Sequence, residues 1–150
     1  MAKASKESEE VSELLFELLM TYKRRIHAAG REHGLSPPQI GTLWYLERDR
    51  GLSMSALAEL LMCDASNVTG IVDNLERRGL AKREQAADDR RVKELLLTEA
   101  GASLRDEIRA ELLTPPRWVQ SLTRAAQREL RDTLRLALES SREDIERSDT

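Results

Sequence analysis

The side chains that could recognise a partner lie between Asp64 and Arg91, where small polar residues and arginines gather. At helical spacing, one face of this stretch carries Ser66, Asn67, Thr69, Gly70, Asp73, Asn74 and Arg77. Such a face suits the major groove of duplex DNA, where Asn can pair with adenine and Ser or Thr can bind phosphates or base edges. An ordinary solvated helix face has the same composition, so the neighbouring residues must decide between the two interpretations.

The segment after Gly79 supports the DNA interpretation. Residues 80–84 and 92–98 have the composition of two strands, and the polar tip QAADDRR joins them. Arg90 and Arg91 stand in this tip beside Asp89, and an arginine inserted into a narrow minor groove gains energy from the negative potential there. The alternative is a surface turn in which the aspartates neutralise the arginines.

Two short helices are expected to position these residues. The first follows Ser53, a capping residue type, and the second follows Asp64, which can cap it. The apolar positions are Met54, Leu57, Ala58 and Leu61 in the first helix and Val68, Ile71, Val72 and Leu75 in the second. Gly79 is expected to end the second helix in the left-handed conformation, with Leu80 closing the cap.

Longer helices flank this segment and predict a second copy of the chain as a partner. An N-terminal helix over residues 9–31 has a long apolar stripe, and Ser36 with Pro37 starts another helix. Thr98 can cap a third, Pro115 and Pro116 interrupt it, and a final helix follows. The apolar positions of the first and last of these helices are Val11, Leu14, Leu15, Leu18, Tyr22, Ile26, Leu130, Leu134, Leu138 and Ile145. A small domain cannot cover both stripes alone, so a twofold homodimer is expected; a folded-back monomer is the alternative.

Composition predicts one cytoplasmic domain. The chain has 150 residues, 40% of them hydrophobic and 34% charged, which suits one core and long helices with wide solvent faces. It has no apolar run long enough for a membrane span, its start lacks the apolar middle of a signal peptide, and a single cysteine allows no intrachain disulfide.

The net charge of −3 is distributed unevenly. The basic cluster consists of Arg77, Arg78, Lys82, Arg83, Arg90, Arg91 and Lys93, whereas acidic residues crowd the C-terminus. Because affinity for DNA depends on local phosphate neutralisation, an acidic chain with this cluster can still bind it.

Other chemistry has little support in the sequence. Cys63 precedes a helix, but the adjacent Asp64 opposes a thiolate, and we expect the thiol to be buried and inert. His27 and His33 are six residues apart, a spacing that does not put two ligands on one helical face. The sequence therefore predicts no metal site, no cofactor and no enzyme.

Four short motifs resemble those of the MarR family of bacterial transcriptional regulators. They are L-A-x-x-L at Leu57–Leu61, V-T at Val68–Thr69, L-E-x-x-G-L at Leu75–Leu80, and D-x-R at Asp89–Arg91 followed by L-x-L-T at Leu95–Thr98. The resemblance places Ser66, Asn67, Thr69 and Gly70 on a recognition helix and Arg90 and Arg91 at a wing. Many relatives have a basic residue at the position of Gly70 or Asn74, so the resemblance does not say which base sequence is read.

The resemblance also implies a small aromatic or anionic ligand that binds between the dimerisation helices and the winged domain. Tyr22, Ile26, His27 and Trp44 become candidates for that pocket, together with Tyr45. The residue types themselves favour core packing for each, and Trp44 follows the stripe of Ile40 and Leu43.

The sequence thus predicts a mainly helical winged helix-turn-helix protein with a small β-hairpin wing and flanking dimerisation helices. Residues 1–150 form one domain, with dimerisation elements at roughly 6–34 and 100–147 and a DNA-binding part at roughly 36–99. The expected function is sequence-specific binding of double-stranded DNA as a homodimer at a pseudo-palindromic operator, with repression that a ligand relieves and no membrane partner. The alternatives are a winged-helix protein-interaction module and, more remotely, an enzyme that uses Cys63 or the histidines.

Overall fold

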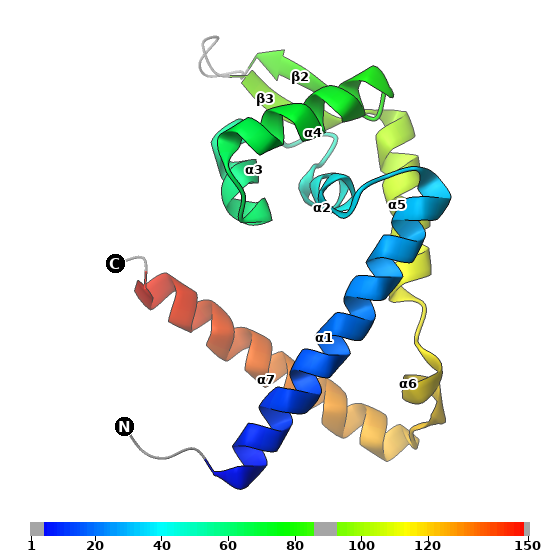
Figure 1. The fold of residues 1–150 in the computed structure, drawn as a ribbon, viewed down its shortest axis with the longest axis vertical. Coiled ribbons are helices and arrows are strands. Elements are labelled where there is room, and N and C mark those ends of the chain that lie inside the picture. The colour runs from blue at the N-terminus through cyan, green and yellow to red at the C-terminus, as the bar shows by residue number, and fades with distance from the viewer. Residues whose placement is uncertain (1–4, 86–92, 149–150) are drawn as a thin grey trace. The chain divides into compact units, whose positions relative to one another are not determined.

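Helices predominate in the computed structural model, which describes residues 5–85 and 93–148, and one small sheet accompanies them (Figure 1). The helices are α1 (Lys6–His33), α2 (Pro37–Tyr45), α3 (Met54–Leu61), α4 (Ala65–Arg77), α5 (Glu99–Leu113), α6 (Arg117–Ser121) and α7 (Arg124–Ser148). The strands are β1 (Leu52–Ser53), β2 (Ala81–Gln85) and β3 (Lys93–Leu97). The chain divides into two compact units, Met1–Leu113 and Thr114–Thr150. The expected fold class is confirmed.

Local capping chemistry explains where the helices of the first unit begin. Ser53 Oγ accepts a hydrogen bond from the Ala56 amide at 3.2 Å, as the sequence predicts for α3. Ahead of α2, the Gln39 side chain accepts from the Ser36 amide at 2.7 Å. Asp64 does stand at the N-cap of α4, but its side chain makes no capping hydrogen bond, so that part of the prediction is wrong. The Asp64 carbonyl instead accepts from the Asn67 amide at 2.9 Å.

The end of α4 has the predicted glycine cap. Gly79 has a φ of 67°, and its amide donates to the Glu76 carbonyl at 2.8 Å. The Leu80 amide donates to the Leu75 carbonyl at 2.9 Å, which satisfies another carbonyl of the last turn. The chain therefore turns directly from α4 into β2.

The sheet has the antiparallel order β1-β3-β2. Leu95 of β3 lies opposite Arg83 on one side and Leu52 on the other. The two long strands match the prediction to within one residue at each end, but the sequence does not predict β1, because a strand of two residues contains no periodicity.

The core of the first unit lies between the sheet and the helices. Its fully buried side chains include Leu43, Leu46, Leu57, Val68, Val72, Leu75, Leu95, Leu97 and Ile108. α2 contributes Leu43, α4 contributes one apolar stripe, and α5 contributes Ile108. The stripes predicted for α3 and α4 therefore face this core.

Thr98 joins the hairpin to α5, as the sequence predicts. Its Oγ1 accepts from the Gly101 amide at 2.9 Å and donates to the Gly79 carbonyl at 2.6 Å. The Thr98 amide donates to the Leu80 carbonyl at 3.2 Å. Gly101 packs so closely here that a Cβ would overlap the Leu80 carbonyl oxygen. One small region thus connects the end of α4, both strands and the start of α5.

The second unit contains a short helix that the sequence does not predict. After Pro115 and Pro116, the five residues of α6 intervene before α7. The Gln127 side chain then donates to the carbonyl oxygens of Val119 and Leu122, at 3.0 and 3.3 Å.

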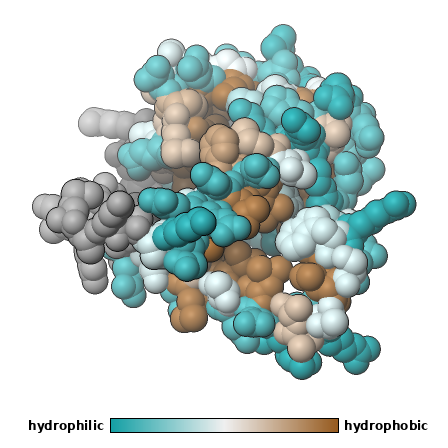
Figure 2. All heavy atoms as spheres, turned by 60° about the horizontal axis from the view of Figure 1, so that its bottom comes forward, coloured by the Kyte–Doolittle hydropathy of each residue, from teal (hydrophilic) through white to brown (hydrophobic). Residues whose placement is uncertain are grey.

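Long apolar stripes on α1 and α7 remain open to solvent. Exposed stripe residues are Val11, Leu14, Leu15, Leu134 and Leu138, and Phe16, Leu19 and Leu136 add further exposed apolar side chains on the same helices. Figure 2 shows apolar surface, in brown, lying open among hydrophilic side chains. No helix within residues 5–85 and 93–148 combines the length and the apolar character that crossing a membrane requires.

Gly101→Ala should destabilise the fold although alanine favours helices. The added methyl overlaps the Leu80 carbonyl, and overpacking of this kind costs about 1–3 kcal/mol. Gly70→Ala is the matched control, because a Cβ there meets nothing within 4 Å, and it should stabilise the protein by about 0.5–1 kcal/mol. Urea unfolding measures the free energy of unfolding of both variants. Equal changes in the two variants would contradict the close packing at Gly101.

Candidate nucleic-acid interface

α4 separates a buried face from a polar one, as predicted. Val68, Val72 and Leu75 are fully buried, and this anchors the helix against α2, α3 and β2. The other face leaves Ser66, Asn67, Thr69, Gly70 and Arg77 exposed, whereas Asn74 is half-buried. With Asp73, six of the seven residues predicted for this face are therefore exposed.

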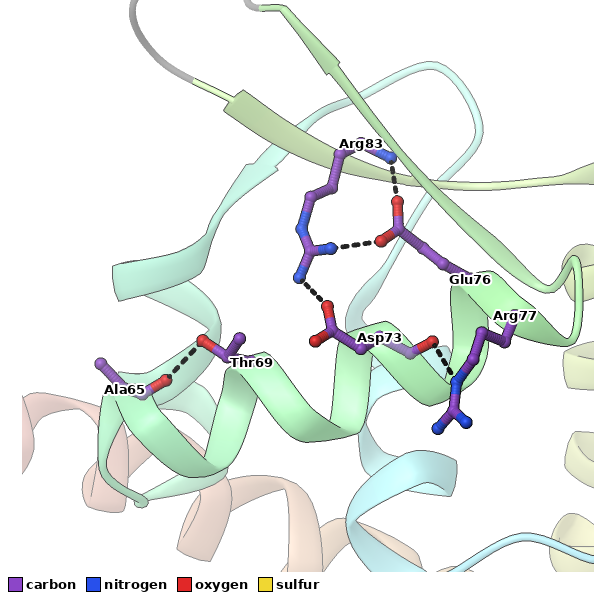
Figure 3. A network of polar contacts seen from close by, with 6 residues as sticks. All are labelled: Ala65, Thr69, Asp73, Glu76, Arg77 and Arg83. Carbon is purple, nitrogen blue, oxygen red and sulfur yellow. Dashed lines mark hydrogen bonds and ion pairs between the residues drawn. The ribbon is translucent and has the colours of Figure 1, made fainter.

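Two of the exposed side chains bond to their own helix. Thr69 Oγ1 donates to the Ala65 carbonyl at 3.2 Å, and Arg77 Nε donates to the Asp73 carbonyl at 3.3 Å (Figure 3). These bonds hold the side chains along the helix. The Thr69 oxygen can still accept a hydrogen bond, and the terminal nitrogens of Arg77 can still donate.

Asn74 lies at the inner edge of the polar face. Gln39 of α2 donates a hydrogen bond from Nε2 to Asn74 Oδ1 at 2.8 Å. Asn74 therefore links α4 to α2, and its amide nitrogen is the group that remains for another partner. The sequence predicts Asn74 on the DNA face only and does not single out Gln39.

An ion-pair network connects α4 to the wing strand β2. Arg83 Nη2 lies 2.8 Å from Asp73 Oδ1, and Arg83 Nη1 pairs with Glu76 Oε2 (Figure 3). The Arg83 amide also donates to Glu76 Oε1 at 2.9 Å. We call these three residues the Arg83 brace. It fixes the direction in which β2 leaves α4.

The brace changes the interpretation of the basic cluster. The sequence predicts Arg83 as a charge available to DNA, but two carboxylates engage it. Lys82 pairs with Glu84, and Arg78 donates to the carbonyl oxygens of Gly34 and His33, at 2.7 and 3.0 Å. Arg77 and Lys93 are exposed, and neither forms an ion pair or a side-chain hydrogen bond with an acidic side chain among the described residues.

The spacing of two acidic residues in the sequence could have predicted the Arg83 brace. Asp73 and Glu76 are three residues apart, so they lie on adjacent positions of one helical face. Arg83 follows the cap glycine by four residues and lies on the strand next to α4, so it can pair with both carboxylates. The predicted wing residues Asp89, Arg90 and Arg91 lie outside the described residues.

The candidates for a ligand pocket are more exposed than predicted. Tyr22 and Ile26 are half-buried on α1, but His27 is exposed and Trp44 of α2 is 36% exposed, so core packing is wrong for these two. Tyr45 is exposed as well. α2 buries Ile40, Thr42 and Leu43, whereas Trp44 remains at the surface.

Arginines accompany two of these aromatic rings. The Arg109 guanidinium carbon lies 4.9 Å from the centre of the Trp44 ring, and that of Arg25 lies 5.4 Å from the centre of the Tyr22 ring. Arg25 also donates to the Glu111 carbonyl at 3.1 Å. Each of these rings therefore has a cationic group over its face.

The remaining reactive residues are dispersed. Cys63 is half-buried rather than buried, because it lies in the turn between α3 and α4. His33 Nε2 lies 3.5 Å from Glu111 Oε2, whereas His27 is exposed on α1. In the part of the chain that the structure describes, no three residues among His, Cys, Asp and Glu are placed to hold a metal ion.

Comparison with known proteins identifies several proteins that are similar to this chain. Residues 33–92 match the family model described as MarR family. YfiV of Bacillus subtilis, named an uncharacterized HTH-type transcriptional regulator, is 38% identical over 65 residues, which are 43% of this chain and 41% of YfiV. MdtR of the same organism, named an HTH-type transcriptional repressor, is 34% identical over 79 residues, which are 53% and 51% of the two chains. The chain spans about half the length of the curated relatives it matches.

Solved structures extend the likeness beyond that segment. The YusO protein of Bacillus subtilis is 26% identical, with a TM-score of 0.68, and the match covers 91% of this chain and 99% of YusO. A MarR family protein of Bacillus stearothermophilus, 21% identical, has a similar fold with a TM-score of 0.82 over 93% of this chain and 99% of its own. The matched segment contains α2, α3, α4 and β2, and the fold likeness includes the flanking helices. Residues 33–92 are therefore similar to the MarR family, and the fold of the chain is similar to that of a solved MarR family protein.

Proposed function

We propose that this chain is a transcriptional regulator that binds double-stranded DNA, with α4 in the major groove. The observation that carries the proposal is the division of α4 into a buried apolar face and an exposed face of small polar side chains. The names of the curated relatives support it, since they are called transcriptional regulators and none is named an enzyme. Repression is part of the proposal, and MdtR is named a repressor.

Each candidate side chain has a specific role in this proposal. Asn67 and Ser66 read base edges, Gly70 lets the helix approach the bases closely, and Thr69 and Arg77 bind phosphates or bases. Asn74 contacts the groove through its amide nitrogen. Arg90 and Arg91 enter or approach the minor groove, with Asp89 bracing the tip.

The Arg83 brace makes this surface compatible with DNA. Asp73 belongs to the polar face of α4, where its carboxylate repels phosphates unless a cation compensates it. Arg83 supplies that cation, and it holds β2 against α4 so that the helix and the hairpin meet the duplex together. We therefore assign Arg83 to positioning and not to phosphate contact.

We further propose that two copies bind a pseudo-palindromic operator. Pairing α1 and α7 with a second copy covers their exposed apolar stripes, and twofold symmetry then spaces two recognition helices about 34 Å apart, one turn of DNA. Residues 6–34 and 100–147 are the dimerisation elements and residues 36–99 the DNA-binding part of a single regulator. A protein that works on chromosomal DNA is expected to act in the cytoplasm.

A small ligand is expected to release the DNA. Tyr22, Ile26, His27 and Trp44 remain its candidate contacts, and Arg25 and Arg109 beside the aromatic rings favour an aromatic or anionic compound.

One observation favours a second candidate function, a protein-interaction module without DNA binding. Arg78, Lys82 and Arg83 are engaged within the chain, so fewer cations remain for phosphates than the sequence suggests. A module of this kind would bind DNA of any sequence weakly or not at all, and this separates the two candidates.

Two substitutions test how the chain reads DNA. Asn67→Ala should weaken binding to the operator by about 1–3 kcal/mol without changing the slope of log affinity against log salt.

Arg90→Ala should flatten that slope by about one unit for each phosphate that the variant no longer neutralises, while leaving thermal stability nearly unchanged. Fluorescence anisotropy over a salt series, on the operator and on a scrambled duplex, measures both effects. If the parent chain binds neither duplex, the interaction-module function replaces the proposal.

Arg83→Met tests the brace. It leaves Asp73 and Glu76 without their cation, so it should weaken operator binding by about 1–2 kcal/mol and lower stability by about 1 kcal/mol, since Arg83 and Glu76 are only partly exposed. Adding Asp73→Asn to this variant should restore much of the DNA affinity. Asp73→Asn alone is the control, and it should change DNA affinity little because Arg83 already compensates the carboxylate. Equal gains from Asp73→Asn with and without Arg83 would contradict the positioning role.

The dimer is tested on α1. Light scattering should give about twice the chain mass of 17.0 kDa. Leu15→Lys places a charge in the exposed apolar stripe and should shift the protein towards monomer or insoluble material. Glu17→Gln changes the charge by the same amount on the polar side of α1 and should leave the mass unchanged. If the parent chain has the mass of a monomer, the proposed homodimer is wrong.

A further inference from the structure

A hollow of about 670 Å³ lies between α2, α3 and α4, within the unit formed by residues 1–113. Its volume falls in the range of small-molecule sites. The candidates for a ligand pocket named above lie outside its lining, apart from Tyr45, so this is a different part of the molecule.

The walls of the hollow are apolar. Pro37 and Pro38 contribute from α2, Leu60 and Leu61 from α3, and Ile71 from α4. Leu60 is 43% exposed. None of the described residues that line the hollow is charged, although 34% of the chain is. An ion that enters this site loses its hydration and gains no opposite charge, so the site favours an uncharged ligand.

Three amide side chains supply the polar groups of the hollow: Gln39, Asn67 and Asn74. Both polar atoms of Gln39 have a partner, because Oε1 accepts from the Ser36 amide and Nε2 donates to Asn74 Oδ1. The carbonyl of Asn74 is thus occupied, and its Nδ2 remains a donor held in a fixed orientation. Asn67 is exposed, and its side chain has no hydrogen bond to any described residue.

We propose that this hollow is a binding site for an uncharged small molecule that has an apolar ring body and a carbonyl acceptor. The ring packs between the prolines of α2 and the leucines of α3, and the carbonyl accepts from Asn74 Nδ2. The amide of Asn67 adds a second hydrogen bond at the mouth.

Occupancy of the hollow excludes DNA directly. Asn67, Gly70 and Asn74 line the hollow and also belong to the face of α4 that we assign to the major groove. A ligand seated there occupies the surface that a base pair needs. This step rests on the proposed function, whereas ligand binding itself does not.

The test uses two probes of the same shape, 2-naphthamide and 2-naphthoate, with the full chain and no DNA. Side-chain amide signals of Gln39, Asn67 and Asn74 are followed by NMR during each titration. A ligand of this size at ordinary efficiency gives a dissociation constant of about 1 mM. We expect 2-naphthamide to shift these signals with saturation and 2-naphthoate to bind at least about tenfold more weakly.

Asn74→Asp is the decisive variant. Its carboxylate still accepts from Gln39 but has no N–H to donate, so affinity for 2-naphthamide should fall about tenfold or more. Gln85→Glu makes the same amide-to-acid change on β2, outside the hollow, and should bind like the parent. Equal affinity of Asn74→Asp and the parent, equal affinity for the two probes, or shifts elsewhere in the molecule would overturn the site. So would amide shifts that follow protein concentration instead of probe, since a second copy would then cover the hollow.

A second arm separates this proposal from the proposed function. With an operator duplex present, saturating 2-naphthamide should lower DNA affinity at least about tenfold, and 2-naphthoate at the same concentration should not. If the probe binds while DNA affinity is unchanged, the exclusion of DNA is wrong. If the chain binds no DNA, the first arm alone decides whether the hollow is a ligand site, and the proposed function fails separately.

Discussion

The tightest constraint in the first unit is the close approach of α5 to the turn that ends α4. Gly101 lies against the Leu80 carbonyl, which also accepts from the Thr98 amide, and Thr98 bonds to both Gly79 and Gly101. The last turn of α4, both wing strands and the first turn of α5 are therefore fixed by one set of backbone groups. A larger residue at Gly101 would separate elements that must move as one body if a helix and a hairpin are to meet the same duplex.

Charge imposes a second constraint on the same elements. A polar helix face that carries Asp73 is poorly suited to a polyanion, and the chain compensates the carboxylate with a cation from β2. The pairing uses an arginine that would otherwise add to phosphate attraction. Its benefit is geometric, because Glu76 also accepts from the Arg83 backbone amide and so fixes the strand itself and not only the side chain.

Patterns of adjacent residues explain why the sequence predicted the helices well. Ser53, Gly79 and Thr98 each make a capping hydrogen bond with a backbone group three residues away, so this effect is visible in the sequence. Interactions between distant residues are different. The Gln39–Asn74 bond spans 35 positions, and its existence depends on how α2 crosses α4. β1 is too short to have a pattern. Trp44 shares the stripe of Ile40 and Leu43 but lies beside Arg109 of α5, a contact between residues far apart in the sequence.

If the proposed function holds, the number of available cations constrains how the chain recognises DNA. Arg78 and Arg83 are engaged in holding the fold, and Lys82 pairs with its neighbour Glu84, so the described residues near α4 offer phosphates chiefly Arg77 and Lys93. Counterion release scales with the phosphates neutralised, so electrostatics supplies a smaller share of affinity here than the seven basic residues of the cluster suggest. The remainder must come from hydrogen bonds and close packing in the groove. In the proposed function we assign those contacts to Asn67, Gly70 and Asn74. These residues also line the uncharged hollow, so the surface proposed to read the DNA sequence is the one proposed to bind an uncharged molecule.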